Sequence, residues 1–146
     1  MNASPIRVLF LCTGNSARSV MGEVLLREMG GTAFEVFSAG TDPKGLNPFT
    51  ARVLEQEHID LAGFRSKSVS EFAGQEFDYV ITVCDDADKN CPNFTGKVGK
   101  RVHIGFIDPA KATGSEEEIL AVFRRVRDEI REKFSDFNAK VIAQNR

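Results

Sequence analysis

The sequence predicts an α/β protein in which a parallel β-sheet is covered by helices on both sides. Short apolar runs alternate along the chain with segments whose apolar residues recur at helical spacing. This alternation is typical of strand–helix–strand units, whose crossovers are right-handed. The 146 residues suit one compact domain over residues 1–146. Ligands of such sheets bind at the carboxyl ends of the strands, so we expect a single site there.

The first half of the chain contains two predicted strands and two predicted helices. Residues 6–11 (IRVLFL) are an apolar run typical of a buried strand, and residues 34–38 indicate the second strand. Between them, residues 19–29 carry apolar side chains at helical spacing, and two glycines follow as a stop signal. A second helix is expected over about 47–58, with Asn as its cap and Pro at the first helical position.

The second half adds two strands and a long helix. Residues 79–84 (YVITVC) and 101–106 (RVHIGF) are apolar runs separated by a polar loop. Ser115, with Glu118 three residues later, has the pattern of a capping box. The apolar face of the helix that follows consists of Ile119, Val122, Phe123, Val126, Ile130 and Phe134. The predicted sheet therefore has four strands.

The charge balance argues against several classes of partner. The chain has 19 basic and 21 acidic side chains, without the basic excess that attracts nucleic acid or anionic lipid. The apolar run at 8–12 is too short to span a bilayer, and Pro5 and Arg7 do not fit a signal peptide. We therefore expect a cytoplasmic protein with no nucleic-acid or membrane partner, and a monomer by default.

The cysteines, Cys12, Cys84 and Cys91, are odd in number, and a reducing cytosol argues against a static disulfide framework. One alternative to a catalytic role is zinc binding. However, Cys84 and Cys91 are farther apart in the sequence than the cysteines of a usual zinc pair, and the two histidines complete no evident ligand cluster. We predict no metal site. Burial is the other alternative, and it is stronger for Cys84, which ends an apolar strand, than for Cys91.

A loop of small and polar residues joins the first strand to the first helix. Its backbone N–H groups and the helix N-terminus can converge on one oxyanion, and Arg18 can grip two oxygens of that anion. A helix N-terminus and a nearby arginine also favour the thiolate of Cys12, to which Ser19 can donate a hydrogen bond. The alternative is a buried strand-end cysteine with Arg18 as a surface cap. The predicted oxyanion-binding residues are Thr13, Gly14, Asn15, Ser16, Ala17, Arg18 and Ser19.

This C-x5-R-S loop resembles the active-site loop of the low-molecular-weight protein tyrosine phosphatase superfamily, and the likeness extends over nearly the whole chain. Residues 83–92 (VCDDADKNCP) and 105–109 (GFIDP) are similar, more specifically, to its thioredoxin-coupled arsenate reductase branch. The resemblance implies a three-layer αβα, flavodoxin-like fold with a four-stranded parallel sheet. It also implies reduction of arsenate by a relay in which Cys12 is the nucleophile, Cys84 the second thiol and Cys91 the final thiol.

The resemblance also favours a role for Asp108 as the acid that protonates the departing oxygen, the alternative being a turn-initiating aspartate before Pro109. It implies no tightly bound cofactor, because thioredoxin supplies the reducing equivalents, with glutaredoxin as an alternative donor. Phosphate or sulfate is expected to compete with arsenate for the loop.

Two rival functions stay open on the sequence. One is a phosphatase that hydrolyses phosphate monoesters through a Cys12 phosphocysteine, its other cysteines only protecting the nucleophile. Ala110 and Lys111 stand where the phosphatase branch usually has aromatic residues, which weakens a phosphotyrosine substrate. The other is a non-catalytic oxyanion-binding or redox-sensing module.

Some members of the arsenate reductase branch bind potassium near the loop, at positions that resemble Asn15, Glu23 and Ser38 together with an acidic residue. This chain has Lys67 at the place of that acidic residue. A fixed ammonium group can replace the ion, so we expect no response to potassium. The alternative is that Lys67 is one more solvated charge.

Overall fold

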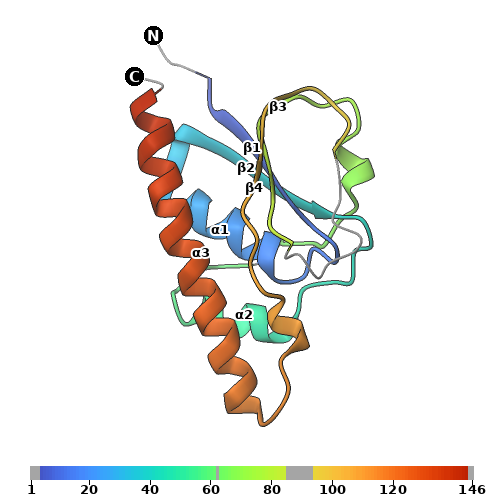
Figure 1. Cartoon of the computed structure of the whole chain (residues 1–146), viewed down its shortest axis with the longest axis vertical. Coiled ribbons are helices and arrows are strands. Elements are labelled where there is room, and N and C mark those ends of the chain that lie inside the picture. The colour runs from blue at the N-terminus through green and yellow to red at the C-terminus, as the bar shows by residue number, and fades with distance from the viewer. Residues whose placement is uncertain (1–3, 62, 85–93, 145–146) are drawn as a thin grey trace.

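The computed structural model describes residues 4–61, 63–84 and 94–144, and within them a four-stranded parallel sheet has the order β2-β1-β3-β4 (Figure 1). The strands are β1 (Ile6–Cys12), β2 (Phe34–Gly40), β3 (Phe77–Thr82) and β4 (Val98–His103). The α-helices are α1 (Arg18–Gly30), α2 (Pro48–Glu55) and α3 (Glu116–Gln144). Short 3-10 turns are η1 (Gly31–Ala33), η2 (Val69–Phe72) and η3 (Pro109–Lys111). The four-stranded parallel sheet with its helices confirms the predicted α/β fold class. Among the described residues, the three α-helices pack on one face of the sheet and only the short η2 lies on the other, where the sequence predicted helices on both sides.

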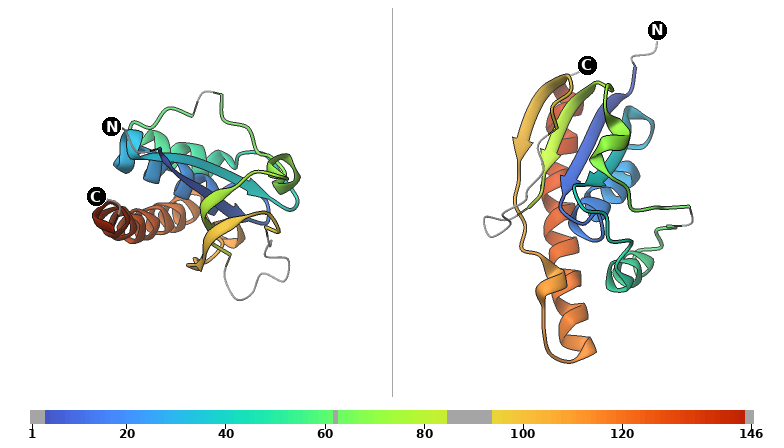
Figure 2. Two further views of the ribbon diagram at one scale, coloured as in Figure 1. Left: turned by 90° about the horizontal axis from the view of Figure 1, so that it is seen from above. Right: turned by 90° about the vertical axis from the view of Figure 1, so that its right-hand side faces the viewer.

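The central strand β1 supplies side chains to two hydrophobic cores, because successive residues of a strand point to opposite faces. Val8, Phe10 and Cys12 belong to the larger core, which α1 and α3 cover on one side of the sheet (Figure 2). Leu9 and Leu11 belong to the smaller core on the other side. This alternation places the Cys12 thiol on the side of the sheet that carries α1.

The smaller core is aromatic and lies beneath η2. Phe77 of β3 makes edge-to-face contacts with Phe72 at 5.9 Å and with Phe94 at 5.4 Å between ring centroids. Phe37 of β2 stacks in the same way against Phe72 and Phe77. A short turn with one buried phenylalanine therefore closes this face of the sheet.

Two strands begin earlier than the apolar runs predicted. The third strand spans 77–82 rather than 79–84, and the fourth spans 98–103 rather than 101–106. The fourth is an edge strand with mostly exposed side chains, so its beginning shows no apolar signal. Backbone pairing continues beyond both strands, because the Phe106 N–H donates to the Val83 carbonyl at 3.2 Å. The predicted residues therefore still extend the sheet toward its carboxyl edge.

The ends of the helices follow local signals in the sequence. Asn47 caps α2 by accepting a hydrogen bond from the Phe49 N–H, as predicted. The helix ends at Glu55 rather than near His58, whose φ of 60° is left-handed and terminates helical geometry. At α3 the predicted capping box forms in both directions between Ser115 and Glu118. The Ser115 N–H holds the pKa of the Glu118 carboxyl below its usual range.

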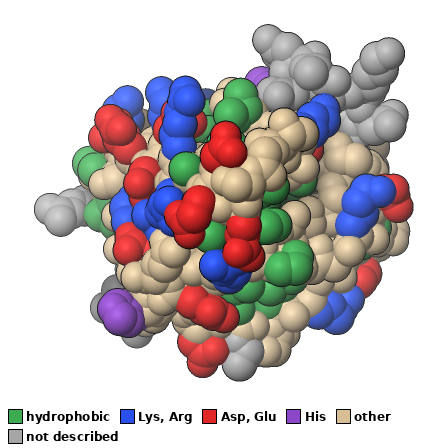
Figure 3. All heavy atoms as spheres, turned by 90° about the horizontal axis from the view of Figure 1, so that it is seen from below, with side chains coloured by type: hydrophobic (Ala, Val, Ile, Leu, Met, Phe, Trp, Pro, Cys, Tyr) green, Lys and Arg blue, Asp and Glu red, His purple; other side chains and the backbone are tan. Residues whose placement is uncertain are grey.

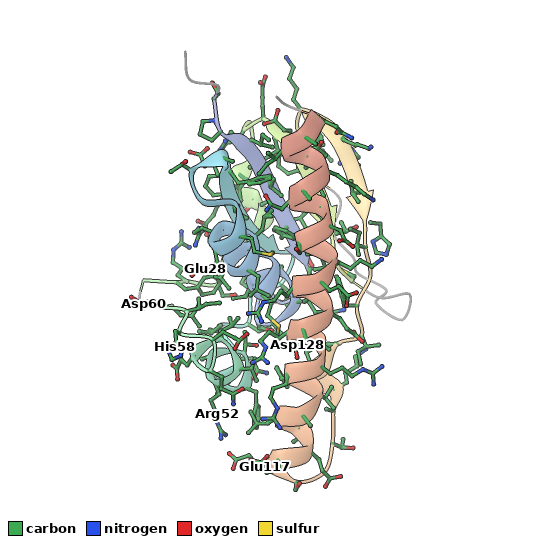
Figure 4. All side chains as sticks on the ribbon, turned by 90° about the vertical axis from the view of Figure 1, so that its left-hand side faces the viewer. Glu28, Arg52, His58, Asp60, Glu117 and Asp128 are labelled. Atoms are coloured by element: carbon green, nitrogen blue, oxygen red, sulfur yellow. The ribbon has the colours of Figure 1, made fainter. Side chains whose placement is uncertain are left out.

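Helix α3 holds α2 in place beside the carboxyl edge of the sheet. The buried Arg127 of α3 donates to the Val53 carbonyl of α2 at 2.8 Å, satisfying one of the last carbonyls of that helix. Arg131 pairs with Glu57, and Arg52 of α2 pairs with Glu116 in the first turn of α3. Figure 4 shows Arg52 near the end of α3 at which Glu117 is labelled. None of the described helices combines the length and apolar character needed to cross a membrane.

Replacing Phe134 by alanine should lower the free energy of unfolding by about 3–5 kcal/mol, as expected for a large buried side chain. Its fully buried ring contacts Phe10 at 4.9 Å between centroids and also packs against Phe106 and Phe137. Urea denaturation followed by circular dichroism measures the change. The control is Ile107→Ala, at a side chain that is 48% exposed, which should change stability far less. Equal losses in the two variants would contradict this account of the core.

Candidate active site

Cys12 ends β1 and is only 2% exposed. It pairs in register with Gly40 at the end of β2. A Cβ atom at position 40 would lie 2.4 Å from the Thr13 carbonyl oxygen and 2.9 Å from the Asn15 nitrogen. Only glycine therefore lets β2 pass this close to the backbone of the loop that follows Cys12.

Four consecutive carbonyl groups of this loop, at residues 13–16, accept hydrogen bonds from surrounding segments. Backbone N–H groups supply most of the donors, and two hydroxyls supply the others. The pairs are Asp42 N to Thr13 O at 2.9 Å, Lys44 N to Gly14 O at 2.9 Å, Ser66 Oγ to Asn15 O at 2.8 Å, Asn47 N to Ser16 O at 3.1 Å and Thr50 Oγ1 to Ser16 O at 2.9 Å. The loop carbonyls are thus directed outward, toward the segments at 41–50 and 66.

The direction of these carbonyls fixes the direction of the loop N–H groups. No peptide bond in the described residues is cis, and in a trans peptide the C=O of one residue points opposite to the N–H of the next. The N–H groups of residues 14–17 therefore face away from the surrounding donors, toward the inner side of the loop and the N-terminus of α1. This arrangement is suited to binding an anion.

Hydrogen bonds also indicate how Ser19 can act on the Cys12 sulfur. The Cys12 sulfur lies 2.8 Å from the Ser19 hydroxyl oxygen. The Lys67 N–H donates to Asn15 Oδ1, so the Asn15 amide must direct its NH₂ group toward Ser19 and Ser38, both at 2.9 Å. Because Ser19 accepts from Asn15, its own proton is available to the sulfur. Ser19 is therefore placed to stabilise a thiolate.

Arg18, the first residue of α1, is buried and faces the segment that follows β4. Its guanidinium donates to the Phe106 carbonyl at 3.2 Å and lies 3.6 Å from the Asp108 carboxylate. Asp108 also accepts the Ala110 N–H at 3.0 Å, which caps η3. The structure thus brings the predicted anion-binding arginine and the predicted acid together at the carboxyl edge of the sheet. Both readings of Asp108, as an acid and as a turn residue, fit this geometry.

The other two predicted cysteines have different outcomes. Cys84 directly follows Val83, whose N–H extends the sheet by donating to the Leu11 carbonyl, and Cys84 is fully buried in the same core as Cys12. Cys12 and Cys84 are both thiols. Cys91 lies outside the described residues. The structure therefore brings Cys84 to the same edge of the sheet as Cys12, and the role of Cys91 stays a prediction.

The side chains considered for potassium bind one another. Ser38 accepts from Asn15 and donates to one Glu23 oxygen at 2.5 Å, and the other Glu23 oxygen accepts from Arg27. These hydrogen bonds hold the side chains of Asn15, Ser38 and Glu23 together, and the expected lack of a response to potassium stays a prediction. The described part of the chain also contains no group of three or more His, Cys, Asp or Glu side chains suited to a metal.

Lys67 is half-buried near this cluster. Its ammonium donates to the Arg65 carbonyl at 2.9 Å and lies 4.7 Å from the centre of the Phe64 ring. Desolvation lowers the pKa of this amine, and the nearby Glu23 carboxylate opposes that effect. If Lys67 replaces a potassium ion, its positive charge must lie near Glu23. The electrostatic interaction between the two side chains is consistent with this.

Gly40, Thr50 and Ser66 contact the loop after Cys12, and sequence reasoning did not single them out as part of the site. Each touches the loop from a segment that is distant in the sequence, and none carries a group that reacts. Their types are common in any turn or helix, so no local pattern distinguishes them. Only the chain topology shows that they share one neighbour.

The face of the molecule at the carboxyl ends of the strands carries interspersed acidic and basic side chains around a small apolar area (Figure 3). Neither acidic nor basic side chains dominate this face, in agreement with the nearly equal numbers of the two in the sequence. Selection of an anion therefore depends on the loop N–H groups and Arg18 rather than on a broad basic surface.

A family model described as low molecular weight phosphotyrosine protein phosphatase matches residues 7–146. The chain belongs to this family. Two curated relatives within it are an arsenate reductase of Bacillus licheniformis, 44% identical, and an arsenate reductase of Bacillus subtilis, 42% identical. Each alignment covers 130 residues, which are 89% of this chain and 93% of the relative.

Solved structures of family members have the same fold. An arsenate reductase in oxidized state superposes with a TM-score of 0.75 at 27% identity, and one in the phosphate binding state with 0.74 at 25%. Each comparison covers 92% of this chain and 98% of the other. A thioredoxin-dependent arsenate reductase of Corynebacterium glutamicum has a TM-score of 0.66 at 26% identity, covering 95% of this chain and 65% of that one.

Potassium should not stimulate this family member, because the ammonium of Lys67, which interacts electrostatically with Glu23, can supply the positive charge in its place. The thermal unfolding midpoint and the rate of Cys12 alkylation by iodoacetamide should be the same in potassium chloride and in sodium chloride at equal ionic strength. Tetramethylammonium chloride provides a control for the anion. A several-fold change in turnover or alkylation that is specific to potassium would show that a cation site forms here.

Proposed function

We propose that this chain reduces arsenate to arsenite through a relay of Cys12, Cys84 and Cys91, with thioredoxin as the external reductant. The observation that carries the proposal is the loop after Cys12, in which outward carbonyls direct four N–H groups to one side, next to Arg18. A tetrahedral oxyanion presents the negative oxygens that such donors bind. The curated relatives named as arsenate reductases support arsenate as that anion.

In the first step, the Cys12 thiolate attacks arsenic and a sulfur–arsenic bond forms. Loop N–H groups and Arg18 hold the other oxygens, and the departing oxygen leaves as water after protonation by Asp108. The 3.6 Å contact between the Asp108 carboxylate and the Arg18 guanidinium supports the assignment of Asp108 as the acid. The phosphate binding state of a related arsenate reductase supports a common site for phosphate and arsenate.

In the second step, the Cys84 thiolate attacks the Cys12 sulfur and forms a Cys12–Cys84 disulfide. The electron pair of the sulfur–arsenic bond passes to arsenic, which leaves as arsenite in the As(III) state. Cys91 then attacks Cys84, which releases the Cys12 thiolate and leaves a Cys84–Cys91 disulfide. The position of Cys84, next to Val83 whose N–H donates to the Leu11 carbonyl, supports its role as the thiol that attacks Cys12.

Thioredoxin closes the cycle by reducing the final disulfide with its own dithiol, so no tightly bound cofactor is needed. The similarity to a structure named as a thioredoxin-dependent arsenate reductase supports this choice of donor. The chemistry requires three thiols to be reduced at the start of each cycle, and a reducing cytoplasm provides that condition.

Each cysteine should be essential for repeated turnover if the relay operates. In a coupled assay with thioredoxin, thioredoxin reductase, NADPH and arsenate, Cys12→Ser, Cys84→Ser and Cys91→Ser should each reduce NADPH oxidation to the background rate. Cys91→Ser should still release about one arsenite per chain in a single turnover, because the first two steps do not use it. Unimpaired NADPH oxidation by Cys91→Ser would contradict the role of Cys91. No arsenate-dependent NADPH oxidation by the unmodified chain, together with Cys12-dependent hydrolysis of an aryl phosphate that Cys91→Ser retains, would favour the phosphatase instead.

Asp108→Asn should lower kcat for arsenate about 100-fold or more, the usual contribution of a general acid. Asparagine can still accept the Ala110 N–H, so η3 should keep its cap while the proton donor is lost. The matched control is Asp136→Asn, at an exposed aspartate of α3, which should leave kcat unchanged. A kcat for Asp108→Asn equal to that of the control would leave Asp108 with only its role in the turn.

A further inference from the structure

The outward carbonyls of the loop differ in the kind of group that holds them. Backbone N–H groups of residues 42, 44 and 47 donate to the carbonyls of Thr13, Gly14 and Ser16. The donor that the structure gives to the Asn15 carbonyl is a side chain, the hydroxyl of Ser66, at 2.8 Å. The orientation of the peptide between Asn15 and Ser16 therefore depends on which residue occupies position 66.

Asn15 also needs more support than its neighbours. Its φ of 46° is left-handed, a region that residues other than glycine rarely occupy without stabilising contacts. Ser66 and Lys67 contact it at two points: the Ser66 hydroxyl donates to its carbonyl, and the Lys67 N–H donates to its Oδ1 at 2.9 Å. The Ser66 oxygen also lies 3.2 Å from the Gly14 carbonyl oxygen. The single Ser66 proton can therefore be shared with a second acceptor through a longer hydrogen bond.

We propose that Ser66 is a positioning residue for the oxyanion site, one that keeps the Ser16 N–H directed at the bound anion. The half-buried hydroxyl holds the Asn15 carbonyl outward, and the planar trans peptide then directs the Ser16 N–H inward. Ser66 does not react with the anion. Its effect passes through the peptide between Asn15 and Ser16.

Loss of this hydroxyl leaves the Asn15 carbonyl without the donor that holds it. The peptide can then rotate and direct a partly negative oxygen toward a site that binds anions. Asn15 still keeps the bond from the Lys67 N–H to its side chain, and that bond orients the NH₂ group toward Ser19. The main effect of losing Ser66 is therefore on anion affinity, while the contact between Ser19 and the Cys12 sulfur is retained.

The test uses inorganic phosphate as the probe and the full chain as the protein. Phosphate bound in the loop protects Cys12 from iodoacetamide, and mass spectrometry of the Cys12 peptide gives the alkylation rate at each phosphate concentration. Ser66→Ala should raise the Kd for phosphate about fivefold, which corresponds to one hydrogen bond of about 1 kcal/mol. Ser66→Thr keeps a hydroxyl at the same position and should restore the Kd to within about twofold of the wild-type value.

The matched control is Ser68→Ala, two residues away. The Ser68 hydroxyl accepts the Ser70 N–H and caps η2, so its removal affects the same segment of the chain without removing a loop contact. This variant should bind phosphate with the wild-type Kd. The thermal unfolding midpoints of all three variants show whether a change in Kd merely follows a general loss of stability.

The possible outcomes separate this inference from the proposed reductase function, on which it rests only for the binding of an oxyanion. Equal Kd values for Ser66→Ala and the wild type, or equal weakening in Ser68→Ala, would overturn the role of Ser66. Weakened phosphate binding in Ser66→Ala, restored in Ser66→Thr, would support it even if the protein proved inactive toward arsenate. Failure of phosphate to protect wild-type Cys12 would overturn the oxyanion site and the role of Ser66 together.

Discussion

The hydrogen bonds that hold the carbonyls of residues 13–16 outward are the constraint on which the site depends. They set the direction of the loop N–H groups, and so decide whether the end of β1 attracts or repels an anion. The donors come from the segment between β2 and α2, from Thr50 in α2 and from the segment before η2. Helix α3 contributes indirectly, because Arg127 and Arg131 hold α2 beside that first segment. Helix α3, which lies away from the loop, thus helps to set the direction of the loop's carbonyl and N–H groups.

A second constraint is a series of hydrogen-bonded side chains that runs from the surface to Cys12. Arg27 pairs with Glu23, which accepts from Ser38, and Asn15 connects Ser38 to Ser19. The Lys67 N–H determines the orientation of the Asn15 amide, which donates to both hydroxyls, and Ser38 in turn donates to Glu23. Buried polar groups are costly when unpaired, so these partners maintain one hydrogen-bond pattern. That pattern ends at Ser19, whose hydroxyl lies 2.8 Å from the Cys12 sulfur and can donate to it.

The fold was predictable where one face of an element is buried, and less so elsewhere. Residues 6–11 and the apolar face of α3 show the periodicities of a buried strand and an amphipathic helix, and both formed as predicted. The start of β4 was missed because an edge strand with exposed side chains has no apolar pattern. Among the site residues, Cys12, Arg18 and Asp108 carry chemistry that their types reveal. Ser66 does not, since a serine in a loop has many structural uses.

The sequence by itself determined the kinds of groups that are present and the order in which they follow the strands. Parallel strands bring their carboxyl ends to one edge, so the sequence predicts that Asp108, just after the fourth strand, faces Cys12. The association of Cys84 with Cys12 is implied by the family resemblance. Only the tertiary structure decided the direction of the hydrogen bonds, from Lys67 to Asn15 and from Ser66 to the loop backbone. The physical reason is that a hydrogen bond depends on relative position and orientation in space. The relative position and orientation of two groups depend on how distant segments of the chain pack, and the local periodicity of a sequence does not reveal this packing.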